Sequence, residues 1–261
     1  MASRIGKKFE ALKKEGKKAF IPYIMCGDPT LEKTEELVGV LEGAGADCIE
    51  LGVPFSDPLA DGPVIQAAGA RALAAGVNLR VVIDFVKKIR NKVRIPLILM
   101  TYYNPVFRYG EEAFAADAAG AGVDGVIIPD LPVDEAASLI KGFRKHAVDT
   151  IFLAAPTSGD DRLKKAASAS RGFIYFVSIT GITGAKLELS GGISHLISRL
   201  GEFSGGKPVA VGFGVSTPEE AGAVAAIADG VIIGSAIVKK AAQSAPEELA
   251  DYLKKLRAAI R

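Results

Sequence analysis

The sequence has few of the residues that form disulfides in secreted domains or bind metal ions. It has two cysteines and two histidines among 261 residues. Cys26 and Cys48 lie in apolar, strand-like stretches, which favours buried free thiols in a reducing compartment over a disulfide framework. His146 and His195 lie far apart and have no metal-ligand spacing around them. We therefore expect no metal site, and two histidines on the surfaces of helices.

The chain also lacks a charge imbalance and a long apolar run. The 32 Lys and Arg residues against 30 Asp and Glu residues leave a net charge of +2, which gives no reason to expect nucleic acid or a membrane as a partner. No apolar run approaches the roughly 20 residues that cross a bilayer. The first twenty residues carry several lysines and no apolar segment of the kind found in a secretory signal. These features predict a cytoplasmic globular protein.

Short apolar runs alternate with helical patterns along the whole chain. Eight runs are nearly continuous in apolar residues, as in parallel strands that helices cover on the outside. They span residues 19–25, 48–53, 96–102, 125–128, 150–153, 173–177, 208–211 and 231–233. Eight strand–helix units in this length predict an α/β fold, a TIM (β/α)8 barrel forming a single domain over residues 1–261. An open doubly wound sheet is the weaker alternative, because no GxGxxG follows the first run.

Additional helices are expected around the eight units. Amphipathic spacing predicts a helix over residues 3–18, before the first strand, and two helices, 64–75 and 79–91, after the second strand. A further helix after the eighth strand is predicted to begin with a capping box at residues 244–247. The remaining helices are predicted over residues 30–44, 111–121, 134–146, 160–170 and 193–200, and from residue 217 onward.

A short pattern recurs at three places where a helix ends and a strand begins. Residues 43–47 and 120–124 share Gly-Ala-Gly-x-Asp, and residues 226–229 repeat the pattern more loosely. Each copy marks the end of a helix, a tight turn and the start of a strand. The repeat therefore supports a fold made of similar strand–helix units.

The most unusual stretch covers residues 46–66. Strand alternation places Glu50 inside a predicted strand, and Asp57 and Asp61 follow in a turn rich in proline. Burying a carboxylate costs several kcal/mol unless a partner is present. An inward carboxylate at the end of a strand, with a second on the next loop, is a plausible acid/base pair. For Asp57 the plainer interpretation, an ordinary turn residue in Ser-Asp-Pro, is equally open.

Glycine-rich turns follow the sixth, seventh and eighth predicted strands, at residues 181–184, 212–216 and 234–235. Amide groups in such turns, together with the start of a helix at Ser235, can bind a phosphate without a cationic side chain. Lys186 and Lys207 are predicted to be solvated loop residues. The sequence holds no strand lysine suited to a Schiff base and no Ser-His-Asp set. The residues thus indicate acid/base chemistry on a small phosphorylated substrate.

The stretch GADCIELGVPFSDPLADGPVIQ resembles the α subunit of tryptophan synthase. Further matching segments are Gly-Asp-Pro at 27–29, Pro-Asp-Leu-Pro at 129–132, and the turns at 181–184 and 212–214. The resemblance covers essentially the whole chain. It implies a lyase of tryptophan biosynthesis that performs retro-aldol cleavage of indole-3-glycerol phosphate to indole and glyceraldehyde 3-phosphate.

The resemblance also implies roles for individual residues. Glu50 matches the general acid/base, and Asp61 the carboxylate that holds the indole N–H. Tyr175 matches a catalytic-site tyrosine near Glu50, and Tyr23 and Tyr102 match positions that bind the substrate. Further substrate-binding matches are Gly184, Phe213, Gly214, Gly234 and Ser235 in the phosphate cradle and Thr183 in the lid. We expect burial to raise the pKa of Glu50, and Asp61 to stay ionised on a wetter loop.

A partner and a cofactor follow from the same resemblance. Asp57 and Asn104 match positions that face the β subunit in a heterotetramer of two α and two β subunits, which channels indole. Pyridoxal phosphate belongs to that partner, so no cofactor is expected in this chain. The sequence departs from some family members at Ser178-Ile179-Thr180, where these carry Ser-Arg. A free-standing lyase, a non-catalytic binding subunit and another sugar-phosphate isomerase or aldolase remain open alternatives.

Overall fold

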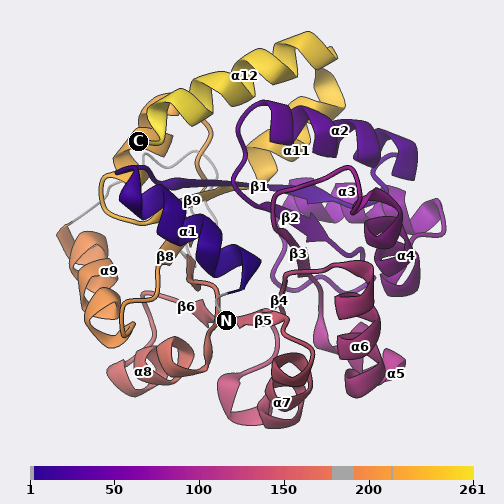
Figure 1. Cartoon of the computed structure of the whole chain (residues 1–261). Helices are drawn as coiled ribbons and strands as arrows, with labels where there is room; N and C mark the ends of the chain where they lie inside the picture. The colour runs from indigo at the N-terminus through magenta and orange to yellow at the C-terminus, as the bar shows by residue number, and fades with distance from the viewer. Residues whose placement is uncertain (1–2, 178–190, 213) are drawn as a thin grey trace.

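A ring of parallel strands forms the centre of the computed structural model, which describes residues 3–177, 191–212 and 214–261. The strands pair in the order β5-β4-β3-β2-β1-β9-β8-β7-β6. Figure 1 shows a nearly closed barrel with helices around its outside. The bounds are β1 Ala19–Met25, β2 Ile49–Gly52, β3 Leu97–Met100, β4 Gly125–Ile127, β5 Asp149–Ile151, β6 Leu153–Ala154, β7 Ile174–Val177, β8 Val209–Gly212 and β9 Gly230–Ile233. The TIM-barrel prediction is confirmed.

The two edge strands of that order, β5 and β6, are one stretch of chain interrupted at Phe152. The first piece pairs with β4, and the second pairs with β7. The backbone carbonyl of Phe152 still accepts a hydrogen bond from the Tyr175 N–H at 3.2 Å. The single strand predicted over residues 150–153 therefore changes its paired neighbour midway. This change connects the two halves of the sheet and nearly closes the barrel.

Helices follow the strands much as predicted. Their bounds are α1 Arg4–Lys14, α2 Leu31–Gly43, α3 Pro63–Ala74, α4 Leu79–Ile89, α5 Tyr103–Tyr109, α6 Glu111–Ala121, α7 Ala137–Lys145, α8 Asp160–Ala169, α9 Gly191–Phe203, α10 Pro218–Ala225, α11 Ser235–Gln243 and α12 Pro246–Ala259, with a 3-10 turn, η1, at Val133–Glu135. The extra helix before β1 and the second helices after β2 and β9 are confirmed. None of the helices in the described part of the chain is long and apolar enough to span a membrane.

Three helix predictions need correction. Helix α5 was missed, because Asn104-Pro105 resembles a turn. The proline lies in the first turn of this helix, where a backbone N–H would have no hydrogen-bond partner within the helix, so its absence costs nothing. Helix α12 begins at Pro246 after Ala245 with no side-chain cap, so the predicted capping box is wrong. Helix α1 ends at Lys14 rather than residue 18, shortly before Gly16 with φ +67°.

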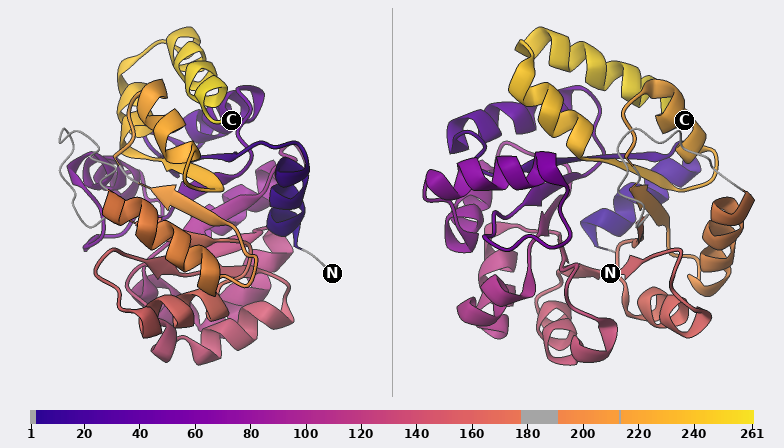
Figure 2. Two further views of the ribbon diagram at one scale, coloured as in Figure 1. Left: turned by 90° about the vertical axis from the view of Figure 1, so that its left-hand side faces the viewer. Right: turned by 180° about the vertical axis from the view of Figure 1, so that it is seen from behind.

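The hydrophobic core has an inner and an outer part. The larger part lies between the strands and the surrounding helices. The smaller one fills the barrel with inward strand residues, and α1 contributes apolar side chains to it; its members include Ile5, Phe9, Leu12, Ile21, Ile98, Ile127, Ile151, Ala210 and Ile232. Helix α1 lies across one mouth of the barrel (Figure 1) and on the far side when the molecule is seen from behind (Figure 2). It therefore closes the end at which the strands begin.

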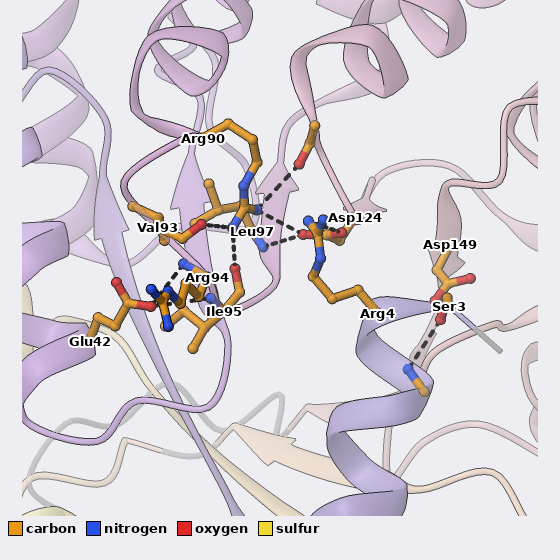
Figure 3. Close-up of polar contacts among 12 residues, drawn as sticks. Ser3, Arg4, Glu42, Arg90, Val93, Arg94, Ile95, Leu97, Asp124 and Asp149 are labelled. Carbon is orange, nitrogen blue, oxygen red and sulfur yellow. Dashed lines mark hydrogen bonds and ion pairs between the residues drawn. The ribbon is translucent and has the colours of Figure 1, made fainter.

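The recurring aspartates lie at this amino-terminal end. Asp47, Asp124 and Asp229 accept hydrogen bonds from backbone N–H groups at or near the starts of β1, β3 and β8, at 3.0, 2.9 and 2.9 Å. Cations also approach them. Arg4 of α1 lies 2.9 Å from Asp124, which Arg90 also contacts at 3.1 Å (Figure 3). Ser3, at the N-cap of α1, donates to Asp149. These polar contacts hold α1 against the barrel.

Candidate active site

Glu50 is the most deeply buried carboxylate at the other mouth of the barrel. It lies on β2 opposite Tyr23 of β1 and Ile98 of β3, and its exposed fraction is 0%. Neither carboxylate oxygen has a hydrogen-bond partner among the described residues. Burial alone raises the pKa of Glu50 to about 8. The side chain is therefore a protonated acid at neutral pH, with a pKa close enough to neutrality to give and take a proton.

Tyr23 and Tyr175 lie near Glu50 from β1 and β7. Each phenol occupies space that a glycine leaves free at the end of a neighbouring strand. A Cβ atom on Gly52 would lie 2.0 Å from the Tyr23 hydroxyl oxygen, and one on Gly212 would lie 2.6 Å from that of Tyr175. Burial, with the nearby carboxylates of Asp61 and Glu50, raises the pKa of both phenols well above the ordinary value. Both hydroxyls therefore stay protonated and neutral.

Asp61 lies on the loop between β2 and α3. The Tyr102 hydroxyl accepts a hydrogen bond from the Ala60 N–H at 3.0 Å, one residue before Asp61 in the chain. Burial raises the pKa of Asp61 to about 6, although the nearby Tyr102 hydroxyl opposes the rise. The expectation of a wet loop is thus wrong in part, because Asp61 is partly buried. Its carboxylate is still mainly ionised at neutral pH.

The candidate phosphate cradle lies beside Tyr23. Gly234 is the N-cap of α11 and provides no side chain to satisfy the first amides of that helix, which begins at Ser235. A Cβ atom on Gly234 would lie 3.4 Å from Tyr23 Cβ. Gly214, after β8, borders open space. Thr183, Gly184 and Phe213, together with Lys186, lie outside the described residues.

An exposed apolar surface adjoins the Asp61 loop. Asp57 and Asn104 are exposed, as are Leu59 at 92% and Phe107 at 67%. Leu59 precedes Ala60, which binds Tyr102, and Phe107 lies on α5, which begins after Tyr102. Sequence reasoning missed Leu59 and Phe107. An apolar residue inside the polar turn Ser-Asp-Pro-Leu-Ala-Asp was the available signal.

Other predicted residues lie away from this mouth. His195 is exposed on α9, as predicted, whereas His146 is partly buried at the end of α7 with Nε2 3.4 Å from Glu112 Oε1. Lys207 is not simply solvated: its Nζ donates to the Ala167 carbonyl at 2.7 Å. Cys26 and Cys48 are buried and unpaired. In the described part of the chain, no group of three or more His, Cys, Asp or Glu residues could hold a metal ion.

Comparison with known proteins gives one consistent result. The family model described as tryptophan synthase alpha chain matches residues 9–261. The chain is 48% identical over 262 residues to the tryptophan synthase alpha chain of Geobacter sulfurreducens, with 99% of each chain covered. It is 48% identical over 245 residues to that of a Picosynechococcus strain, covering 94% of this chain and 92% of the relative.

Solved structures agree with the sequence comparison. Tryptophan synthase subunit alpha from Legionella pneumophila superposes with a TM-score of 0.91 at 38% identity, covering 100% of this chain and 99% of that chain. A tryptophan synthase structure from Mycobacterium tuberculosis gives a TM-score of 0.93 at 39% identity, again covering 100% and 99%. The similarity therefore extends over the barrel and all its additions.

Proposed function

Because this chain belongs to the tryptophan synthase alpha chain family, a lyase component, we propose that it cleaves indole-3-glycerol phosphate. The products are indole and glyceraldehyde 3-phosphate, and the reaction is a retro-aldol cleavage in tryptophan biosynthesis. The observation that carries the proposal is the position of Glu50: it is fully buried at the barrel mouth, with no hydrogen-bond partner among the described residues. A carboxylate held in this way is available for proton transfer to a substrate.

Glu50 performs both proton transfers. It begins as an acid and gives its proton to the indole ring carbon that bears the glycerol chain. It then takes the proton of the adjacent chain hydroxyl, the carbon–carbon bond breaks, and its electron pair returns to the ring while the aldehyde forms. The carboxyl group ends protonated, as it began. A pKa of about 8 suits both roles because neither protonation state is strongly disfavoured near neutral pH.

Asp61 stabilises the cation between these two steps. Protonation of the ring carbon places positive charge on the indole nitrogen. An ionised carboxylate beside the N–H stabilises that charge most strongly where water is excluded. With a pKa of about 6, Asp61 is mainly charged at neutral pH while Glu50 is mainly protonated. The two acids therefore divide the work by their unequal proton affinities.

The remaining residues bind the two ends of the substrate. Tyr23, Tyr102 and Tyr175 provide aromatic walls for the indole ring. The phosphate lies at the start of α11 on backbone amides, with Gly184, Phe213, Gly214, Gly234 and Ser235 as its cradle. By the family resemblance, Thr183 is a further proposed substrate-binding residue. Backbone amides can bind the phosphate dianion without help from a cationic side chain.

A β subunit binds the exposed surface that carries Asp57 and Asn104, in a heterotetramer of two α and two β subunits. Leu59 and Phe107 favour this arrangement over a free-standing lyase, because large apolar side chains this exposed mark interaction surfaces. Pyridoxal phosphate belongs to the partner, and this chain uses no cofactor in the cleavage.

The test is indole release from indole-3-glycerol phosphate by the purified chain, with and without a β subunit. We expect Glu50→Gln and Asp61→Asn each to lower turnover by roughly 10²-fold or more, with folding retained. The matched control is Glu10→Gln, which changes an exposed carboxylate on α1 at the opposite mouth. Near-normal turnover in the Glu50 variant would refute the assignment. If the chain releases no indole both alone and with a β subunit, the result would favour a non-catalytic subunit.

A further inference from the structure

Helix α1 supplies part of the packing inside the barrel, besides covering its amino-terminal end. Ile5 and Phe9 of α1 are 0% and 5% exposed and belong to the same apolar cluster as the inward residues of the strands. Two glycines leave room for them. A Cβ atom on Gly125 of β4 would lie 2.8 Å from Ile5 Cδ1, and one on Gly172, just before β7, would lie 3.0 Å from Ile5 Cγ2. The barrel interior therefore accommodates side chains from α1.

Three aromatic rings connect α1 to the opposite mouth of the barrel. The Phe9 ring packs against the Phe173 ring with 5.6 Å between centroids and a tilt of 44°. The Phe173 ring lies 6.5 Å from the Tyr175 ring, with a tilt of 54°. Phe173 directly precedes β7 and Tyr175 is its second residue, so both point to the same face of the strand. The rings of Phe9, Phe173 and Tyr175 thus form a continuous aromatic column through the barrel.

The aromatic column ends beside the candidate acid/base. In the pairing order β2-β1-β9-β8-β7 three strands separate β2 from β7, so Glu50 and Tyr175 face each other across the barrel. The Tyr175 side chain is 8% exposed and that of Phe173 is fully buried. A Cβ atom on Gly212, at the end of β8, would lie 2.6 Å from the Tyr175 hydroxyl oxygen. Packing against Gly212 on one side and Phe173 beneath therefore holds the phenol in place.

We propose that Phe9 is a positioning residue for Tyr175: from the far end of the barrel it supports Phe173 and thereby fixes the phenol beside Glu50. This inference rests on the proposed cleavage reaction, in which Tyr175 provides one wall for the indole ring. It gives α1 a duty in the reaction itself. A wall displaced by about 1 Å would let the indole carbon move away from the carboxyl group that protonates it, and such misplacements can lower turnover by up to roughly 10²-fold.

The surroundings of Phe9 direct the effect of its loss toward Phe173. Protein interiors are closely packed, so a side chain beside an emptied space moves into it where it can. Gly172, next to Phe173 and with φ of +80°, has no side chain to fill that space. The N-cap and first residue of α1 bind Asp149 and Asp124, contacts in which Phe9 takes no part. The helix therefore stays docked when the ring is removed.

The experiment compares Phe9→Ala with Phe143→Ala in the full chain. Phe143 is a matched control, because it is a buried phenylalanine on a helix, α7, and its ring lies 5.5 Å from that of Phe114 in the outer part of the core. Both substitutions remove the same atoms from the core, but only the first interrupts the aromatic column. Phe9→Leu is the second variant, which keeps most of the apolar volume and serves where the alanine variant fails to fold.

Two properties are measured for each folded variant. The first is kcat and KM for indole-3-glycerol phosphate. The second is the carbon-13 NMR resonance of Tyr175 in the chain labelled at the Cζ atoms of its tyrosines, identified by its loss in Tyr175→Phe. This resonance reports the surroundings of the phenol without substrate.

We expect Phe9→Ala to lower kcat by roughly tenfold and to change KM by less than about threefold, because the phosphate end of the substrate is bound elsewhere. The Tyr175 resonance shifts or broadens in the same variant, since the ring beneath it has moved. Phe9→Leu gives the same changes at smaller size, with kcat lowered by about threefold. Phe143→Ala leaves kcat and the Tyr175 resonance as they are in the unmodified chain.

An unchanged kcat in both Phe9 variants, or a Tyr175 resonance that stays in place, overturns the inference. An equal fall of kcat in Phe143→Ala also overturns it, because any loss of core packing would then act alike. Failure of the proposed function is recognised separately. If the unmodified chain releases no indole, the cleavage reaction is wrong, and the Tyr175 resonance alone decides whether Phe9 holds the phenol.

Discussion

Acidic side chains lie at both ends of the barrel, and the two sets differ in their surroundings. At the amino-terminal end Asp47, Asp124 and Asp229 each accept a backbone N–H and lie near at least one cation. At the carboxyl-terminal end Glu50 has no hydrogen-bond partner among the described residues, and Asp61 lies near the Tyr102 hydroxyl. The carboxylates at one end serve the structure, and those at the other end are the ones that we propose take part in chemistry.

Depth of burial does not separate the two sets. Burial raises the pKa of Asp124, but the Leu97 N–H, Arg4 and Arg90 all act against that rise. For Glu50 burial is the one cause, and it raises the pKa to about 8. The lesson is that partners, more than depth, decide whether a buried carboxylate is structural or reactive.

The largest expected effect is the pH dependence of stability that Glu50 introduces. The folded-state pKa of about 8 lies above the ordinary 4.5, so the unfolded chain loses this proton first as pH rises. The buried Glu50 does not lower the free energy of unfolding below pH 4.5. Above that pH the free energy of unfolding falls by on the order of 1.4 kcal/mol per pH unit, and it stops falling above pH 8. We expect Glu50→Gln to become steadily more stable than the unmodified chain across this window, by urea unfolding. A constant difference across pH 5–8 would contradict the unpartnered burial of Glu50.

A second prediction removes a carboxylate at the opposite end. Asp124→Ala leaves the Leu97 N–H without its acceptor and Arg90 without its ion pair, at a cost of about 3 kcal/mol in the free energy of unfolding. Turnover per folded molecule stays unchanged, in contrast to Glu50→Gln. Asp124→Asn, which keeps one acceptor oxygen, is the milder control. A loss of turnover without a loss of stability would show that the two ends are not functionally distinct.

The smallest effect comes from adding a carboxylate where the structure has none. Gly234→Asp places a negative charge at the start of α11, where we propose that the substrate phosphate binds, and we expect KM to rise by roughly tenfold with stability little changed. Gly234→Ala separates charge from shape, because a Cβ there meets Tyr23 at an ordinary 3.4 Å. Equal KM values for the aspartate and alanine variants would count against the phosphate cradle.

Periodic patterns were reliable wherever one residue's environment depends on its own strand or helix. Alternation along β2 placed Glu50 inward, and helical spacing placed Ile5, Phe9 and Leu12 against the barrel. Helix α5 was missed because the local signal of Asn104-Pro105 also fits a turn. The broken strand at Phe152 was missed because pairing with β4 or β7 leaves no mark in a short apolar run.

The sequence by itself determined the barrel, the inward direction of Glu50 and the glycine at the start of α11, because strand alternation and turn chemistry are local properties. Only the tertiary structure decided the environment of Asp61. Its loop is tied to Tyr102, whose hydroxyl meets an amide 42 residues earlier in the chain. No local pattern records such a contact, because the pairing of β2 with β3 places the two following loops side by side. The surrounding barrel buries Glu50 and thereby raises its proton affinity.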